Sequence, residues 1–225
     1  IHQFAEKVAL ITDGTNPVGM AVALQLALNG SYVVVGIPNV GTSEKSSIDE
    51  LESLGTLAMS VDWETESGGN DLIEAVRDKF GRLDLLVNCL KSDNDTAKNT
   101  DGTIEHYLNS VCQLTEKAVQ LMSERPKPRI VNVVSACDTE IGSDPVFAAT
   151  QAGIIGLTKA LAIELPKHFR INALSISAKM AAANGFDPEL VRPQPMVSPD
   201  DAARTILFLL SGESASIHGQ VISLG

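Results

Sequence analysis

Short runs of consecutive apolar residues alternate along this chain with longer stretches that repeat apolar residues at helical spacing. A continuous run rich in Val, Ile and Leu is typical of a strand that is buried on both faces. Such runs predict seven strands, at residues 7–12, 32–35, 57–61, 83–88, 129–135, 169–176 and 220–224. The periodic stretches predict helices at residues 18–29, 48–54, 71–80, 104–123, 145–165 and 199–210.

Turn and cap residues separate these elements. Gly30 and Gly81 are C-cap candidates for the helices that they follow, and Ser198 is an N-cap candidate. Residues 91–103 and 179–198 are expected to be loops. Because strands alternate with helices, we predict an α/β fold with one doubly wound, Rossmann-type parallel sheet and helices on both faces. A length of 225 residues suits a single domain of this kind, spanning residues 1–225.

Composition narrows the class of protein. A hydrophobic fraction of 44% and a mean hydropathy of +0.10 exclude disorder over most of the chain. The net charge of −11 argues against nucleic acid and against anionic membranes as partners. No apolar run reaches the roughly 18 residues of a membrane helix, and the first residues lack the layout of a signal peptide, so we expect a cytoplasmic protein. The cysteines have no paired spacing and are interpreted as buried thiols, and no His, Cys and Asp cluster has metal spacing.

The chain resembles the short-chain dehydrogenase/reductase family over nearly its whole length, and is most similar to the 3-oxoacyl-carrier-protein reductases. The resemblance rests on scaffold segments spread along the sequence. They are residues 7–12 (Lys-Val-Ala-Leu-Ile-Thr), 82–88, 130–135, 152–165, 170–173 and 218–222, together with Asn109. The resemblance implies the same doubly wound fold.

The catalytic set that this resemblance implies is incomplete. Asn109 and Ser135 match the family's Asn and Ser, whereas Phe147 and Gln151 stand in place of its Tyr and Lys. In the family the Tyr protonates the developing alkoxide, and the Lys lowers the pKa of that Tyr and holds the cofactor ribose. Phe has no hydroxyl and Gln no charge, and a proton donor of this kind contributes roughly 10²–10⁴-fold. Ser135 is alternatively a retained strand-end hydroxyl, and Asn109 a residue that stabilises a helix irregularity or binds water.

The glycine-rich turn that the family uses for the cofactor pyrophosphate is also altered. Thr12 and Gly19 fit the motif, but Asp13 and Pro17 replace two glycines; Thr12, Gly14 and Gly19 are the residues of this turn predicted to contact a cofactor, if one binds. Pro17 has no N–H to donate. A carboxylate at ~6 Å from a phosphate charge repels it by about 3 kcal/mol at an effective dielectric of ~20. The alternative interpretation is a turn that only leads into a helix, with Pro in the first helical turn.

At most of the other positions that bind the cofactor in the family, this chain has different residues. Residues 36–39 contain neither the Arg nor the Asp that the family uses to read the cofactor's ribose. Asp62 matches the residue that contacts adenine, and Asn88 is the one residue kept from the Asn-Asn-Ala-Gly element. The larger side chains of Leu90 and Lys91 are expected to fill space that the family leaves for the ribose, although ordinary packing at a strand end is an alternative.

Two hypotheses follow. The first is a catalytically inactive family member that binds no cofactor and acts as a structural subunit or binding module. Its partner is another copy, in a dimer or tetramer built on helices 104–123 and 145–165, or an active reductase chain. The apolar positions of these two helices recur on more than one face, and one face suffices to cover the sheet. They are Val111, Leu114, Ala118 and Leu121 on the first helix, and Ala152, Ile155, Leu157 and Leu161 on the second. The second is a carbonyl reductase, similar to the 3-oxoacyl reductases, that uses NADP(H) or NAD(H) with a different proton donor.

Overall fold

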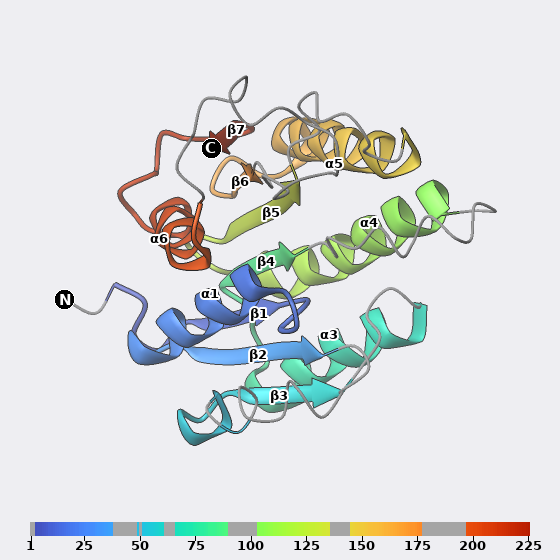
Figure 1. The fold of residues 1–225 in the computed structure, drawn as a ribbon. Coiled ribbons are helices and arrows are strands. Elements are labelled where there is room, and N and C mark those ends of the chain that lie inside the picture. Colours follow the sequence, from blue (N-terminus) through green and yellow to red (C-terminus); the bar gives the residue numbers. More distant parts are fainter. Residues whose placement is uncertain are drawn as a thin grey trace, which may run out of the picture.

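A computed structural model describes residues 3–37, 49, 51–60, 66–89, 103–135, 145–176 and 197–225. Seven strands form one parallel sheet in the order β3-β2-β1-β4-β5-β6-β7 (Figure 1). They are β1 (Val8–Ile11), β2 (Tyr32–Ile37), β3 (Leu57–Ser60), β4 (Leu85–Cys89), β5 (Arg129–Ser135), β6 (Arg170–Ile176) and β7 (Val221–Leu224). The predicted fold class and the predicted seven parallel strands are confirmed.

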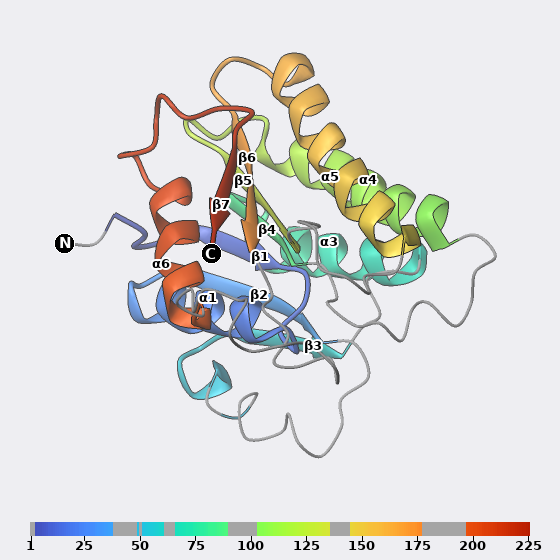
Figure 2. The ribbon, with the colours of Figure 1, turned by 45° about the horizontal axis from the view of Figure 1, so that its top comes forward.

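Helices cover both faces of this sheet. They are α1 (Pro17–Leu28), α3 (Glu66–Phe80), α4 (Thr103–Met122), α5 (Pro145–Glu164) and α6 (Pro199–Leu210). Figure 2 shows α1 and α6 on one side and α3, α4 and α5 on the other. Each layer packs on its own apolar cluster, because the continuous apolar strands present side chains to both faces.

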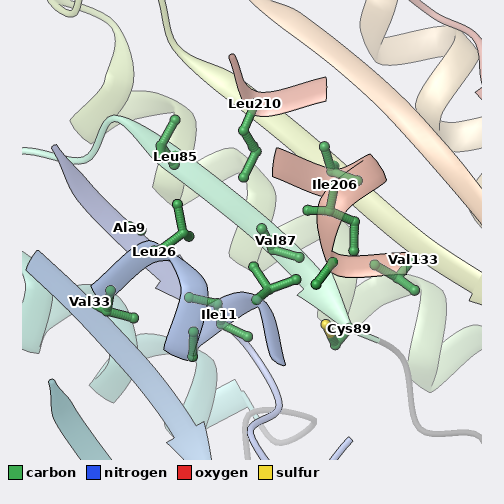
Figure 3. Packing of buried hydrophobic residues seen from close by; sticks show 14 of the residues in the cluster. Ala9, Ile11, Leu26, Val33, Leu85, Val87, Cys89, Val133, Ile206 and Leu210 are labelled. Carbon is green, nitrogen blue, oxygen red and sulfur yellow. The ribbon is translucent and has the colours of Figure 1, made fainter. Parts of the chain in front are cut away.

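The cluster under α1 and α6 is the one nearest the predicted cofactor turn. Figure 3 shows strand residues such as Ile11 and Val87 meeting Leu26 of α1 and Ile206 of α6. Cys89 lies at the end of β4 within the same cluster, completely buried.

Among the described residues, every helix is too short or too polar to cross a membrane.

Element boundaries differ from the predictions at a few places. Helix α3 begins at Glu66, five residues before its predicted start at Asp71. The intervening residues include Gly68 and Gly69, which disfavour a helix locally. Both glycines are buried in the structure, so packing overrides their low propensity. Most of the predicted loops, at 91–103 and 179–198, lie outside the described residues.

The edge of the sheet at which the strands end is here called the carboxyl edge. The order of the strands reverses at one place along this edge. Strand β1 lies between β2 and β4, so the chain leaves it first toward one side of the sheet and later toward the other. In doubly wound folds ligands bind at this reversal, outside the carboxyl ends of the strands. Position 13 lies two residues after the end of β1, and Ser135 ends β5 at the same edge.

Candidate functional site

The turn after β1 is closed by the side chain of Asp13. Its Oδ1 atom accepts hydrogen bonds from the Thr15 backbone N at 2.7 Å, the Thr15 Oγ1 at 2.6 Å and the Asn16 backbone N at 3.3 Å. Asp13 is only 1% exposed. The carboxylate therefore occupies backbone donors at the start of α1, where a dinucleotide fold presents its N–H groups to phosphate.

The remaining donors of this turn are also engaged. Gly14 N donates to Gly36 O at 2.8 Å, which joins the turn to the end of β2. Asn16 is the N-cap of α1, and its Oδ1 accepts from Val18 N at 2.9 Å. Pro17 is the first helical residue and has no N–H. From residue 14 to residue 18, every backbone N–H thus has an acceptor inside the chain.

Gly14 and Gly19 are required by the packing of the chain itself. A Cβ atom at Gly14 would overlap Val35 Cγ1, and one at Gly19 would overlap the backbone oxygen of Asp13. Thr12, the third residue predicted to contact a cofactor in this turn, is buried and exchanges hydrogen bonds with the backbone of Cys89, at 3.0 and 3.2 Å. These three residues, predicted as cofactor contacts, therefore have structural tasks that need no ligand.

Burial raises the pKa of the Cys89 thiol far above its usual range, and the nearby Asp13 carboxylate raises it further. A thiol is nucleophilic as its thiolate. Cys89 is accordingly an inert packing group beside the turn, as predicted, whereas Cys112 is only partly buried and Cys137 lies outside the described residues.

Asn88 belongs to a buried polar network between the sheet and helices α4 and α5. Its Nδ2 donates to Asn132 Oδ1 at 2.8 Å and to Thr115 Oγ1 at 3.2 Å. Asn132 Nδ2 in turn donates to Thr158 Oγ1 at 2.8 Å. Within the described part of the chain, Asn88 Oδ1 is buried without a partner. The hydrogen bonds of Asn88 thus tie the sheet to its helices. Asp62, Leu90 and Lys91 lie outside the described residues.

The structure brings two of the four predicted catalytic positions together. Gln151 of α5 is 1% exposed, and its Oε1 accepts a hydrogen bond from the backbone N of Ser135 at 3.0 Å. A lysine could not accept this bond, because its ammonium group only donates. Gln151 therefore ties α5 to the end of β5. Phe147 lies one turn earlier on α5 and is half-buried.

Asn109 is not brought to this group. It is exposed on α4, whereas Val111 and Leu114 are buried against the core. At 100° per residue, Asn109 is roughly 200° from Val111 around the helix, so it faces away from the sheet. Of the two retained matches, only Ser135 is held in a hydrogen bond with another predicted catalytic position, Gln151.

Sequence reasoning missed the roles of Thr15 and Asn16, which bind Asp13 and cap α1. A local signal exists for both. Asp side chains often bond the backbone two residues on, and Asn is a preferred N-cap immediately before Pro at the first helical position.

Comparisons with known proteins agree with this scaffold. The family model described as enoyl-(acyl carrier protein) reductase matches residues 15–224. The 3-oxoacyl-[acyl-carrier-protein] reductase FabG of Thermotoga maritima is 31% identical, over 97% of this chain and 96% of the relative. The (2S)-[(R)-hydroxy(phenyl)methyl]succinyl-CoA dehydrogenase subunit BbsD of Thauera aromatica is 30% identical, over 96% and 94%.

Solved structures show the same fold. A short-chain dehydrogenase from Mycobacterium smegmatis superimposes with a TM-score of 0.79 at 28% identity, covering 100% of this chain and 94% of that one. L-Sorbose reductase from Gluconobacter frateurii, solved with NADPH and L-sorbose, gives a TM-score of 0.80 at 22% identity, covering 98% and 95%.

Proposed function

The chain belongs to the short-chain dehydrogenase/reductase family, and within that family we propose that it is a catalytically inactive member that serves as a structural subunit. The scaffold is retained across the sheet and both helical layers, while the positions that would bind cofactor and transfer a proton have taken other tasks. The proposal concerns this chain alone and not its active relatives.

The single observation that carries the proposal is the closed turn after β1. Every backbone N–H from residue 14 to residue 18 is bonded within the chain, and two of these bonds go to the carboxylate of Asp13. A pyrophosphate at this position would have to displace a buried carboxylate of its own charge sign. The residues present therefore do not fit a nicotinamide dinucleotide, and we derive no hydride-transfer step through one.

The altered proton-transfer positions support the same conclusion. Phe147 cannot donate a proton. The side-chain carbonyl oxygen of Gln151 accepts a hydrogen bond from the backbone N of Ser135. Ser135 alone is a poor general acid at neutral pH. Both the donor and the group that would tune its pKa are thus absent from these positions.

Assembly with another family member is the role that the outer face of α5 supports best. Its exposed residues are mostly small, with the large apolar Ile163 85% exposed. They are Ala149, Ala152, Gly156, Lys159, Ala160, Ile163 and Glu164. Small residues let another backbone approach closely. One relative of this chain is itself named as a subunit of a dehydrogenase, and we infer that the partner here is an active reductase chain or a second copy.

Of the residues predicted to form this interface, all but Ala152 instead pack on the core of the chain itself. Val111, Leu114 and Ala118 are buried, and Leu121, Ile155, Leu157 and Leu161 are partly buried against the same cluster. The second apolar face expected from their spacing is therefore covered internally on α4. The proposed contact rests on the outer face of α5.

Titration of the purified chain with NADPH and with NADH, by calorimetry and nicotinamide fluorescence, tests the proposal. We expect no saturable binding below about 1 mM. A dissociation constant below ~10 μM, about −7 kcal/mol, would refute it. FabG-type relatives that are run in parallel establish that the assay detects binding.

A working reductase is the second candidate, because relatives of about this length are named 3-oxoacyl-[acyl-carrier-protein] reductases. It requires a proton donor other than residue 147. Reduction of a 3-oxoacyl thioester by the unmodified chain at roughly 1 s⁻¹ or faster, an ordinary enzyme rate, would favour this candidate over the inactive subunit.

A further inference from the structure

Two arginines lie side by side at the amino edge of the sheet, where the strands begin. Arg129 is the first residue of β5 and Arg170 the first residue of β6, and they are direct partners in the parallel register. Register partners in a parallel sheet project to the same face. Here that face is the one under α6, because Val131 and Leu174 on the same sides of these strands join the α1 and α6 cluster.

Both guanidinium groups bind only carbonyl oxygens. Arg129 donates from Nε to Ser211 O and from Nη1 to Pro128 O, each at 3.4 Å. Arg170 donates from Nε to Ala215 O at 2.6 Å, and from Nη1 to the oxygens of Lys167 and Phe169, both at 2.7 Å. Within the part of the chain that the structure describes, neither forms an ion pair with a carboxylate, and neither Nη2 has an acceptor.

The buried acid of this edge is already engaged. Asp84 accepts from Val8 N at 2.9 Å and pairs with Arg125 at 2.7 Å and with Arg82 at 3.5 Å. Arg129, Lys127 and Arg125 lie close enough to Lys7 for their charges to act on it. Burial lowers the pKa of Lys7, and Arg129, Lys127 and Arg125 lower it further against the opposing effect of Asp84.

A purely structural explanation of these arginines is that they cap the carboxyl end of α6, because basic side chains often bind the last carbonyls of a helix. Ser211, the C-cap of α6, does accept from Arg129. A helix terminus carries only about half a negative charge, however. Two adjacent full positive charges exceed it, and only 4% of the Arg129 surface is exposed.

We propose that Arg129 and Arg170 form a binding site for a small oxyanion of the phosphate type at the amino edge of the sheet. A guanidinium group presents paired N–H donors in a planar fork that matches phosphate oxygens. The unbonded Nη2 groups of the two arginines are the donors available for this contact. The site lies at the opposite edge from the closed turn after β1 and does not depend on the proposed function.

Calorimetric titration of the full chain with sodium phosphate, against sodium chloride at equal ionic strength, tests the site. We expect saturable binding of phosphate and none of chloride. Arg170→Gln should weaken phosphate binding at least about tenfold, since it removes one of the two charges. Arg204→Gln is the matched control, because Arg204 is 64% exposed on α6 and pairs with Asp201. It should bind phosphate like the parent.

A second variant, Arg129→Lys, tests the site if Arg170→Gln is unstable. Arg129→Lys retains the charge and loses the fork, and it too should weaken binding while circular dichroism shows a native fold. Equal phosphate affinity in Arg170→Gln, Arg129→Lys and the parent would overturn the site, as would phosphate binding no stronger than chloride binding.

The turn after β1 is the other place where phosphate could bind. Asp13→Asn should leave phosphate affinity unchanged if the two arginines hold the anion. A large gain in Asp13→Asn, with no loss in Arg170→Gln, would place the anion at the turn and overturn the arginine site. Phenyl phosphate then distinguishes the source of the group: equal affinity indicates free phosphate, and tighter binding indicates a phosphate ester.

Discussion

At the scale of single residues, Asp13 and Gln151 accept hydrogen bonds that glycine and lysine side chains could not accept. Asp13 closes the turn after β1, and Gln151 joins α5 to the end of β5. Both side chains help to hold the fold together, and this makes their roles testable by stability as well as by activity.

Gln151→Lys is expected to destabilise the chain. It leaves the Ser135 N–H without its acceptor, which costs about 1–3 kcal/mol, and it places an ammonium group at a position that is 1% exposed. We expect a melting temperature lower by roughly 4 °C or more for a chain of this size. The control is Gln113→Lys, at an exposed position on α4. Equal melting temperatures for the two variants would contradict the structural role.

Two substitutions separate the effect of the Asp13 charge from the effect of the hydrogen bonds that Asp13 accepts from Thr15 and Asn16. Asp13→Asn removes the charge but keeps an oxygen that accepts from Thr15 and Asn16, whereas Asp13→Gly frees both N–H groups. We expect Asp13→Gly to improve NADPH affinity at least about tenfold, or 1.4 kcal/mol, and Asp13→Asn to improve it less. Calorimetry measures both. No gain in Asp13→Gly would mean that the turn is not what excludes the cofactor.

At the scale of elements, α6 begins with a capping box that explains its confirmed start. Ser198 Oγ accepts from the Asp201 backbone N at 3.1 Å, and the Asp201 carboxylate accepts in return from the backbone and hydroxyl of Ser198. Ser198→Ala should lower the free energy of unfolding by about 1 kcal/mol. Urea denaturation measures the loss, and Ser123→Ala, at an exposed position just after α4, is the control.

The same box predicts a pH dependence. Hydrogen bonds from the Ser198 side chain and backbone, followed by the charge and hydrogen bond of Arg204, lower the pKa of Asp201. A lowered folded-state pKa contributes stability above the unfolded pKa, near pH 4, and that contribution disappears as the pH falls through the folded value. Asp201→Asn should therefore be less stable than the parent at pH 7, with the gap narrowing toward pH 3. A gap that stays constant with pH would contradict the coupling.

At the scale of the whole molecule, the two helical layers differ in the surfaces that they cover and expose. The α1 and α6 layer buries the cluster beneath the closed turn, while α5 in the opposite layer presents an outer face of small residues (Figure 2). Both layers are needed to bury the apolar side chains that the strands present to the two faces of the sheet. An exposed apolar residue such as Ile163 has no such internal explanation.

Ile163→Glu should weaken the proposed assembly without affecting the fold. We expect light scattering to show smaller species than for the parent at the same micromolar concentration, and circular dichroism to be unchanged. Leu28→Glu is the matched control, because Leu28 is 66% exposed on α1, in the other helical layer. Loss of assembly in Leu28→Glu, with none in Ile163→Glu, would place the interface elsewhere.

Much of this protein could be predicted from local patterns. Apolar runs and helical spacing revealed the seven strands and the main helices, because burial on one or two faces leaves its period in the sequence. The Ser198 cap was readable for the same reason, since it involves neighbours in the chain. The helix predicted from residue 18 begins one residue earlier, at Pro17. The replacements at positions 13, 147 and 151 needed only a comparison of residue types with the family's motifs.

Only the tertiary structure decided which distant groups meet. The acceptor of the Ser135 N–H comes from α5, the early start of α3 depends on buried glycines, and Asn109 faces outward because its neighbours pack inward. Arg129 and Arg170 are adjacent because β5 and β6 pair in parallel register. Such contacts join residues far apart in the chain, and their geometry is set by the packing of whole elements, which leaves no local period from which to read it.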